Sequence, residues 1–407
     1  MERDKQSGGF LVMNILVVNA GSSSIKSVLF TAQNGSFERI IDCTASNISE
    51  QRASIDVTLN GESTCYPTSL PDHATALAAI LETIQQHASL DDIDSVGYRV
   101  VYGGSTYYKP TVINDEVQAD LASFNDIDPE HAPLSLAIIT QLRADLPHAQ
   151  HIACFDTAFF HDLPAVAHTV AIPREHRDAG IRRFGYHGLS YQYVSDKFGQ
   201  LAGDAARRGR VIYAHLGSGA SVAATLNGLP VDTTMGVTPT SGLVMGTRSG
   251  DVDPSLPWML SRSADMSIDE YQHMINHQSG LLAVSELSSD MYTLLQHQST
   301  NPSAALAVEL FCYQVKKAIG SLSATIGGID SLVFCGGMAE QSAEIRRRIC
   351  EGLEYLGVVL SPDANERRDR LISAPESQVG VHVIPTDEAL AIATNIVSIS
   401  TNAKDSH

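Results

Sequence analysis

Short apolar runs alternate with small polar turns along the first half of the chain, and this pattern predicts an α/β protein. Two segments have apolar residues at helical spacing, His73–His87 and Pro133–Leu142. The strands expected in the first half are Asn14–Asn19, Ile25–Phe30, Phe37–Cys43, Ile55–Leu59, Ser95–Val101 and His151–Phe155.

The second half repeats this order. A strand, Val211–Ala214, is followed by a small-residue turn and a returning strand, Ser221–Leu226. Ser331–Phe334 then ends in two glycines, as Ser95–Val101 does, and Val381–Ile384 leads to a helix over Ala389–Val397. The glycines of the two turns, Gly21 and Gly217, lie close to half the chain length apart. The repetition predicts a duplicated α/β domain with a cleft between the copies.

Composition narrows the class of protein. The 407 residues are enough for two or three domains, and 43% hydrophobic with 18% charged residues excludes a disordered chain. The net charge of −19 argues against nucleic acid or an anionic membrane as partner, although a local basic cluster can still bind a small anion. No apolar run approaches the ~20 residues that span a bilayer.

The apolar run Phe10–Val18 near the N-terminus has two interpretations. Its flank carries Glu2 and Asp4 beside two basic residues, so it lacks the positive bias of a signal peptide, and a buried first strand is favoured. Met13 is a candidate start, which would make residues 1–12 an extra arm. The six cysteines form no C-x-x-C pair and predict reduced thiols in a cytoplasmic protein.

Two Gly/Ser turns are candidate phosphate-binding loops. In Asn19–Lys26, small residues would let backbone N–H groups approach phosphate oxygens, with Lys26 as a nearby charge. An ordinary β-hairpin turn explains the same residues equally well. The second turn, His215–Ser221, could form the same cradle, and the two together could hold the ends of a polyphosphate. Neither is a Walker loop.

The segment Asp232–Pro254 predicts an irregular but well-packed loop, because apolar residues punctuate its glycines and hydroxyl residues. Arg248 in this loop is suited to bind phosphate or carboxylate, but an arginine near Asp251 and Asp253 also suits a structural ion pair.

Several polar residues stand where α/β folds place site residues. Arg99 lies in an apolar strand and therefore needs an anionic partner, and Asp156 directly follows a strand. His187 ends a basic run that begins at Arg174, although a solvated basic face is the default interpretation of such a run. Thr386 is a candidate helix N-cap, with Glu388 in the first turn.

Eight motifs together resemble the acetate kinase family, short-chain acyl kinases of the sugar kinase/Hsp70/actin superfamily. The resemblance extends from Met13 to Ile396, and Asp232–Pro254 is its most specific part. The motifs are NAGSSSIK, GYRVVYGG, FDTAFF, RRFGYHG, HLGSGAS, DTTMGVTPTSGLVMGTRSGDVDP, FCGGMAE and IPTDEALAIA.

The resemblance implies duplicated ribonuclease H-like domains around an interdomain cleft. It implies an N-terminal acyl-kinase domain over 13–160 plus about 390–402, and a C-terminal nucleotide-binding domain over 161–389. It further implies reversible, ATP-dependent phosphorylation of acetate or propionate with Mg²⁺ or Mn²⁺, in a homodimer.

The resemblance also implies a role for each matching residue. Asp156, His187 and Arg248 would be catalytic, and Arg99 would bind substrate. Asn19 and Glu388 would hold the metal. The acyl pocket would be lined by Val101, Leu134, Tyr186 and Pro239. Nucleotide contacts would come from Lys26, His215, Leu216, Gly217, Ser218, Gly219, Asp290, Met291, Tyr292, Gly337, Met338, Ala339, Glu340 and Gln341.

The sequence departs from the family pattern mainly outside the catalytic set. Ser135 replaces an expected histidine, Ser218 an asparagine, and Tyr292 an arginine. These changes bear on nucleotide and acyl-chain preference more than on the reaction. Two alternatives stay open: a kinase for another acyl chain or phosphoryl donor, and a non-catalytic ATP-binding module of the actin/Hsp70 type.

Overall fold

The computed structural model describes residues 12–126 and 128–402, which form two compact units. Unit 1 contains the N-terminal part up to Ala158 and the C-terminal part from Asp387. Unit 2 is Phe159–Thr386. These divisions fall within a few residues of the predicted domain boundaries. Most of the proposed arm, residues 1–12, lies outside the described residues.

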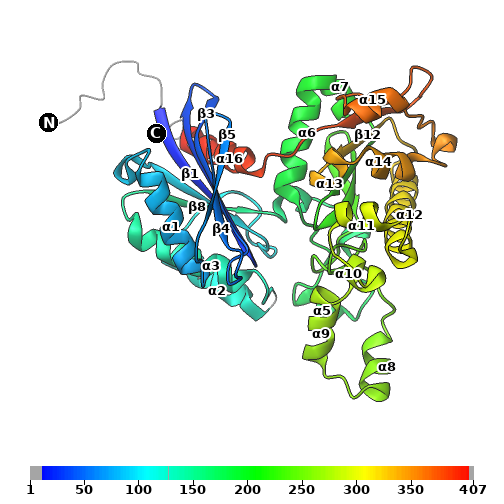
Figure 1. Cartoon of the computed structure of the whole chain (residues 1–407), viewed down its shortest axis with the longest axis horizontal. Coiled ribbons are helices and arrows are strands. Elements are labelled where there is room, and N and C mark those ends of the chain that lie inside the picture. Colours follow the sequence, from blue (N-terminus) through cyan, green and yellow to red (C-terminus); the bar gives the residue numbers. More distant parts are fainter. Residues whose placement is uncertain (1–11, 127, 403–407) are drawn as a thin grey trace. The chain divides into compact units, whose positions relative to one another are not determined.

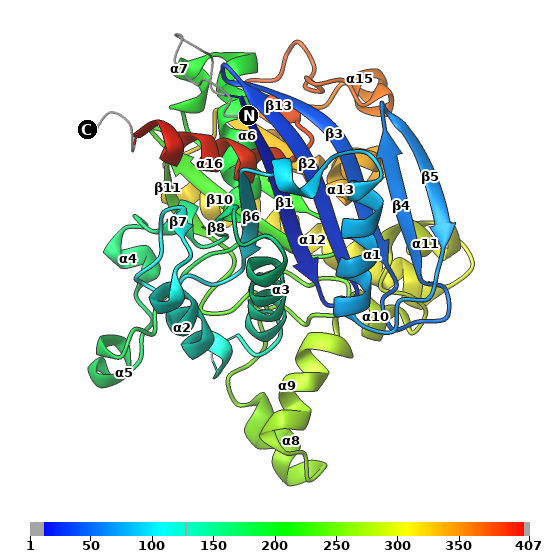
Figure 2. The same ribbon diagram turned by 90° about the vertical axis from the view of Figure 1, so that its left-hand side faces the viewer.

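Unit 1 is built on an eight-stranded mixed sheet with the order β5-β4-β3-β2-β1-β6-β8-β7. Strand β1 is antiparallel to β2 and parallel to β6, which is parallel to β8 (Figure 2). The strands are β1 Val12–Gly21, β2 Ser24–Gln33, β3 Ser36–Ser46, β4 Ser54–Leu59, β5 Glu62–Pro67, β6 Ser95–Val100, β7 Thr111–Val112 and β8 Gln150–Phe155.

In the described part of unit 1 the α-helices are α1 His73–Gln85, α2 Asp115–Ser123, α3 Ala132–Asp145 and α16 Glu388–Asn402. Helix α16, at the C-terminal end of the described chain, packs against the sheet of unit 1 (Figure 1). It comes so close to Gly97 of β6 that a Cβ there would lie 2.5 Å from Ile392 and Ile396. Glycine at this position therefore sets how closely α16 approaches the sheet.

Unit 2 has a five-stranded sheet with the order β11-β10-β9-β12-β13. Its strands are β9 Val211–Leu216, β10 Ala220–Leu226, β11 Leu229–Thr233, β12 Ser331–Cys335 and β13 Gly380–Val383. The helices are α4 Ala165–His168, α5 Arg174–Asp178, α6 Gly188–Ala202, α7 Asp204–Arg207, α8 Leu256–Ser263, α9 Ile268–His277, α10 Gly280–Ser285, α11 Met291–His297, α12 Pro302–Thr325, α13 Gly337–Gln341, α14 Ala343–Cys350 and α15 Pro362–Arg367.

The two sheets share one plan, which confirms the predicted α/β class and repeat. The central five strands of unit 1, β3-β2-β1-β6-β8, correspond in order and direction to β11-β10-β9-β12-β13. In each, three antiparallel strands are followed by two parallel ones. The carboxyl ends of the parallel strands meet at one edge, where α/β folds place their sites.

The structure confirms most predicted elements and corrects one cap. The apolar run near the N-terminus continues into β1, where Ile15–Val18 are buried, although Phe10 and Leu11 lie outside the described residues. Thr386 is not the cap of α16, because Asp387 Oδ1 accepts the Leu390 N–H at 2.9 Å. The helix also runs to Asn402, beyond the predicted end at Val397.

The state of the cysteines and the length of the apolar helices can be compared with what the sequence predicted. All six cysteines are free thiols. None of the helices in the described part of the chain is long and apolar enough to cross a membrane.

Candidate active site

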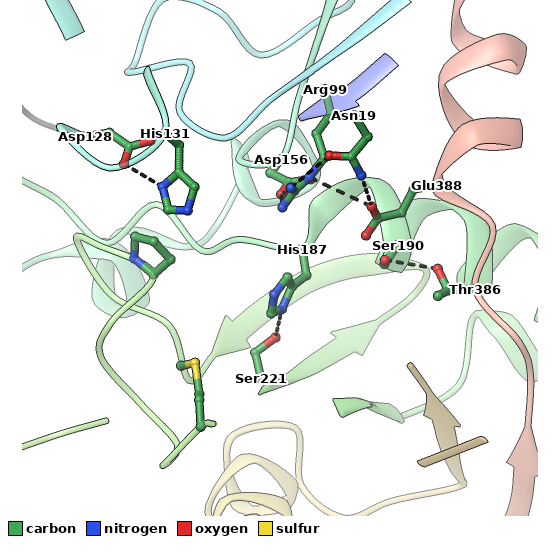
Figure 3. A network of polar contacts seen from close by, with 12 residues as sticks. Asn19, Arg99, Asp128, His131, Asp156, His187, Ser190, Ser221, Thr386 and Glu388 are labelled. Carbon is green, nitrogen blue, oxygen red and sulfur yellow. Dashed lines mark hydrogen bonds and ion pairs between the residues drawn. The ribbon is translucent and has the colours of Figure 1, made fainter. Parts of the chain in front are cut away.

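A network of charged and amide side chains lies at the carboxyl ends of the parallel strands in unit 1. Asn19 is near the end of β1, Arg99 near the end of β6, and Asp156 directly after β8. Glu388 joins them from the first turn of α16 (Figure 3). Four sequence-distant segments therefore bring their predicted site residues together in this unit.

Arg99 has the anionic partner that its apolar strand requires. Its Nε donates to Asp156 Oδ2 at 2.9 Å and Nη2 contacts the same oxygen, while Asp156 is fully buried. Burial opposes the positive charge of Arg99, but the Asp156 and Glu388 carboxylates outweigh it and raise the arginine pKa. The guanidinium is thus held charged and oriented.

Asn19 connects this ion pair to Glu388. Its amide nitrogen donates to Glu388 Oε2 at 3.1 Å, and its amide oxygen accepts from Arg99 Nη1 at 3.3 Å. Two carboxylates and an amide oxygen are hard donors of the kind that Mg²⁺ prefers, with substrate phosphates and water completing its shell. Among the described residues, no three His, Cys, Asp or Glu side chains group as a full metal cage. The donor set therefore fits a magnesium ion shared with a phosphate ligand.

The first Gly/Ser turn is a tight hairpin between β1 and β2, in which Gly21 pairs with Ser24. The hairpin interpretation is confirmed at the level of the backbone. Lys26 lies opposite Asn19 in the hairpin and its side chain is exposed. The hairpin therefore places a lysine on the strand beside the network, and phosphate binding by this turn stays a prediction.

His187 is held by a buried hydroxyl cluster in unit 2. It caps the start of α6 in the left-handed backbone conformation, with φ of 60°, which is uncommon for a residue with a side chain. Its Nδ1 lies 2.9 Å from Ser221 Oγ (Figure 3). The same oxygen is 2.6 Å from the Tyr191 hydroxyl. Its ring packs against His215 at a centroid distance of 4.3 Å. A strained backbone conformation such as that of His187, held in place by its surroundings, is typical of functional positions.

Gly219 brings this histidine together with Arg248. A Cβ at Gly219 would lie 3.0 Å from His187 Nε2 and 4.0 Å from Arg248 Nη1. Arg248 also donates to the Pro239 carbonyl at 3.3 Å and reaches Met245 Sδ at 4.0 Å. Its loop is irregular but anchored by buried Met235, as the sequence predicted. The His187 imidazole and the Arg248 guanidinium therefore both lie next to the glycine turn at Gly219, and we refer to them as the His187–Arg248 group.

The predicted acyl-pocket residues fall into two pairs, one in each unit. Val101 is buried next to β6, and Leu134 packs at the margin of the unit 1 core. In unit 2, Tyr186 is buried and donates its hydroxyl to the Val237 carbonyl at 2.6 Å, two residues from Pro239. Tyr186 therefore fixes the loop in which Pro239 accepts from Arg248.

The predicted nucleotide-binding residues of unit 2 lie largely on neighbouring loops. The turn Gly217–Gly219 connects β9 and β10, and Gly336, which precedes α13, lies so close to Leu216 that a Cβ would be 2.7 Å from its carbonyl oxygen. Ser218 accepts a backbone hydrogen bond from Gly246 at 3.2 Å. Asp290 caps α11 and leaves Tyr292 exposed. Small residues thus allow these backbones to approach one another.

Glu340 is part of α13, and its carboxylate accepts hydrogen bonds from two backbone N–H groups. Oε1 accepts from Gly336 N at 2.8 Å and from Thr386 N at 3.1 Å. Burial raises the pKa of this carboxyl, against the lowering effect of the two N–H donors. The other α13 residues differ in exposure, since Ala339 is buried while Gly337 and Gln341 are at least partly exposed. Glu340 therefore supports the loop, and nucleotide contact by its side chain stays a prediction.

Ser221 and Tyr191 belong to the His187 group. Sequence analysis placed Ser221 in a candidate loop and Tyr191 where the family pattern has a histidine, but it gave neither a role in supporting His187. Ser221 closes the motif HLGSGAS at the start of β10, and Tyr191 lies one helical turn after His187. The spacing of four residues on a helix was the available signal for Tyr191.

The chain matches the family model described as the Acetokinase family over residues 14–394. An acetate kinase from Rhodopseudomonas palustris is 43% identical over 94% of this chain and 97% of its own length. An acetate kinase from Phocaeicola vulgatus is 38% identical over 95% of this chain and 99% of its own length.

Two solved structures resemble this one along nearly the whole chain. Acetate kinase from Porphyromonas gingivalis superposes with a TM-score of 0.84 at 35% identity, covering 95% of this chain and 99% of that one. A propionate kinase from Francisella tularensis gives a TM-score of 0.88 at 32% identity, covering 94% of this chain and 98% of the other.

Proposed function

Because this chain belongs to the acetate kinase family, we propose that it transfers the terminal phosphoryl group of ATP to acetate, reversibly, forming acetyl phosphate. The observation that carries the proposal is the Arg99 network together with the His187–Arg248 group. Both occur at or beside strand ends of sheets with the same plan. Phosphoryl transfer depends on positioning and charge neutralisation more than on covalent help from the protein, and these groups supply both.

In this mechanism Arg99 binds the carboxylate of acetate, and Asp156 keeps Arg99 charged and oriented. Acetate is a carboxylate with a pKa near ~4, so at neutral pH it is already ionised and no general base has to deprotonate it. The contact of two guanidinium nitrogens with one Asp156 oxygen supports an orienting role for this aspartate. A hydroxyl acceptor, as in a sugar kinase, would instead need a base.

His187 and Arg248 then stabilise the charge on the phosphoryl group as it moves. Both can donate hydrogen bonds, and both lie against the backbone of Gly219. The turn Gly217–Gly219 and helix α13 bind the nucleotide in this proposal, which makes unit 2 the nucleotide-binding unit and unit 1 the acyl-kinase unit. Asn19 and Glu388 would hold Mg²⁺, which neutralises phosphate charge when it is bound.

A hydroxamate assay tests the activity. Acetyl phosphate formed from acetate and ATP is trapped by hydroxylamine, and acetate, propionate and butyrate are each paired with ATP, GTP and pyrophosphate. The proposal expects turnover with acetate and ATP. Turnover with another pair only would favour a different acyl chain or donor, and no turnover with any pair would favour a non-catalytic ATP-binding module.

We also propose a homodimer, as the family resemblance implied. Light scattering on the purified full chain, with and without nucleotide, measures the mass directly. A mass of about one chain at micromolar concentration would contradict it.

A further inference from the structure

Arg39, on β3 of unit 1, is an arginine that the proposed chemistry does not use. Its Nη2 donates to both carboxylate oxygens of Asp387, at 2.7 Å each. The other terminal nitrogen donates to Asp42, and the guanidinium carbon lies 5.1 Å from the centre of the Phe30 ring. The guanidinium is therefore fixed by two carboxylates and an aromatic face.

Asp387 begins the helix that carries the proposed metal ligand. Its Oδ1 accepts from Leu390 N at 2.9 Å, and its backbone carbonyl accepts from Ala391 N at 3.0 Å. One carboxylate thus caps α16 and binds Arg39 at the same time. Strand β3 is in this way connected to the first turn of α16.

Glu388 follows Asp387 directly and belongs to the turn that this cap fixes. Its carboxylate accepts from Asn19 at 3.1 Å and lies 3.9 Å from Arg99 Nε. Further along the helix, Ile392 and Ile396 pack over Gly97 and hold the helix on the sheet. Packing therefore sets the position of the helix, whereas the cap sets the orientation of its first turn.

We propose that Arg39 is a positioning residue for Glu388: by holding Asp387, it fixes the carboxylate that would bind the divalent cation. This inference rests on the proposed function, in which Glu388 is a metal ligand. Groups that orient metal ligands typically change metal affinity by about 10- to 100-fold when they are removed. A partly exposed ion pair contributes little to stability, so the two effects can be separated.

The test measures metal binding without turnover. Mn²⁺ is titrated into the full-length protein with ADP, and free Mn²⁺ is followed by electron paramagnetic resonance. We expect Arg39→Ala to weaken Mn²⁺ binding by about 10-fold. Arg39→Lys, which keeps the charge but loses the fork, should lie between wild type and alanine. Hydrogen exchange of the Leu390 and Ala391 amides should become faster in Arg39→Ala, with little change in Tm.

Arg143→Ala is the matched control, because Arg143 also forms a partly exposed ion pair in unit 1, with Asp115. It should bind Mn²⁺ as wild type does. Asp387→Asn is a second variant that keeps a capping side chain but loses the charge that Arg39 binds, and it should weaken Mn²⁺ binding as Arg39→Ala does.

Two results would overturn the inference: unchanged Mn²⁺ affinity in Arg39→Ala, or equal weakening in Arg143→Ala. If Arg39→Ala does not fold, the decision passes to Asp387→Asn, where unchanged affinity again refutes the inference. The proposed function fails separately, if wild type gives no hydroxamate with any substrate pair.

Discussion

The two units place different chemistry on the same strand plan. In unit 1 the strand ends carry an arginine, an amide and a carboxylate, and Glu388 adds a second carboxylate from the first turn of α16. In unit 2 the strands β9 and β12 are followed by glycines, and His187 and Arg248 are supported by hydroxyl, ring and backbone contacts. The fold thus determines where a site forms, and the side chains at the strand ends determine what each unit can contribute.

This difference has an energetic consequence. The buried charge of Asp156 is paired with Arg99, so removing Arg99 would leave an uncompensated buried charge and lower stability. Arg248 donates to the Pro239 carbonyl and to Met245 Sδ, whereas Arg99 contacts a fully buried carboxylate. The same substitution should therefore affect the two units unequally.

The largest expected effect comes from truncating the two arginines. Arg99→Ala and Arg248→Ala should each lower kcat/KM by ~10²-fold or more, because each removes a charge partner of the reacting groups. Only Arg99→Ala should also lower the free energy of unfolding strongly, by roughly 3–5 kcal/mol, because it leaves Asp156 buried beside no arginine. Steady-state kinetics and urea unfolding measure the two quantities.

Comparing Arg99→Ala with Arg248→Ala tests whether the loss of an arginine destabilises unit 1 more than unit 2. Arg143→Ala serves as the control for both measurements. Equal stability losses in the two variants would contradict the contrast, and near wild-type rates in both would mean that these arginines are structural.

The next largest effect should come from Gly219→Ala in unit 2. The added Cβ would lie 3.0 Å from His187 Nε2, so the imidazole has to move, and we expect kcat to fall by about 10- to 100-fold. In Gly320→Ala the new Cβ meets only the Tyr355 hydroxyl, at 3.2 Å, within helix α12. That control should keep wild-type kinetics, and a matching loss in both would argue against displacement of His187.

Ser221→Ala should have a smaller effect, which tests whether hydroxyl support of His187 matters. The substitution removes the shared partner of His187 Nδ1 and the Tyr191 hydroxyl. Losing a buried hydrogen bond costs roughly 0.5–1.5 kcal/mol, so thermal unfolding should shift and kcat should fall by roughly 10-fold. Ser323→Ala removes another buried hydroxyl, which donates to Ile319 O within a helix, and should leave kcat unchanged.

The smallest expected effect concerns the buried carboxyl of Glu340. Because burial raises its pKa in the folded state, the folded protein binds this proton more tightly than the unfolded chain. The contribution of Glu340 to the free energy of unfolding is therefore greatest at low pH. It is lost as the pH rises from the pKa of the unfolded chain, near ~4.3, through the raised pKa of the folded protein. Urea unfolding of wild type and Glu340→Gln across this range should show wild type losing stability relative to the variant. A difference independent of pH would contradict the shift.

Much of the strand plan could be predicted from sequence because most strands contain an apolar run bounded by turn residues, whereas β5, which was not predicted, is exposed along its whole length. Hydrophobic spacing located ten of the thirteen strands in the described sheets and missed β5, β7 and β11. The apolar context of Arg99 required the partner found in Asp156. Contacts between specific residues far apart in the sequence are a different matter. The Asn19–Glu388 contact joins residues 369 positions apart, and the family resemblance, rather than spacing, brought them together.

Local capping and support were less accessible to sequence analysis. Thr386 and Asp387 are both good capping residues in adjacent positions, and tertiary contacts decide between them: Thr386 donates to Ser190, which leaves Asp387 to cap α16. The contacts of Ser221 with His187 and of Arg39 with Asp387 are likewise tertiary. Each joins segments far apart in the chain, and no sequence pattern indicates which residues of the two segments meet.

The central proposal is that the Arg99 network of unit 1 and the His187–Arg248 group of unit 2 take part in the same phosphoryl transfer. A crystal structure with ADP, Mg²⁺, acetate and aluminium fluoride, a planar mimic of the transferring phosphoryl, tests it directly. The account predicts that His187 and Arg248 contact the fluoride atoms while Arg99 contacts the acetate that is in line with them. An aluminium fluoride group contacted by residues of one unit only would contradict it.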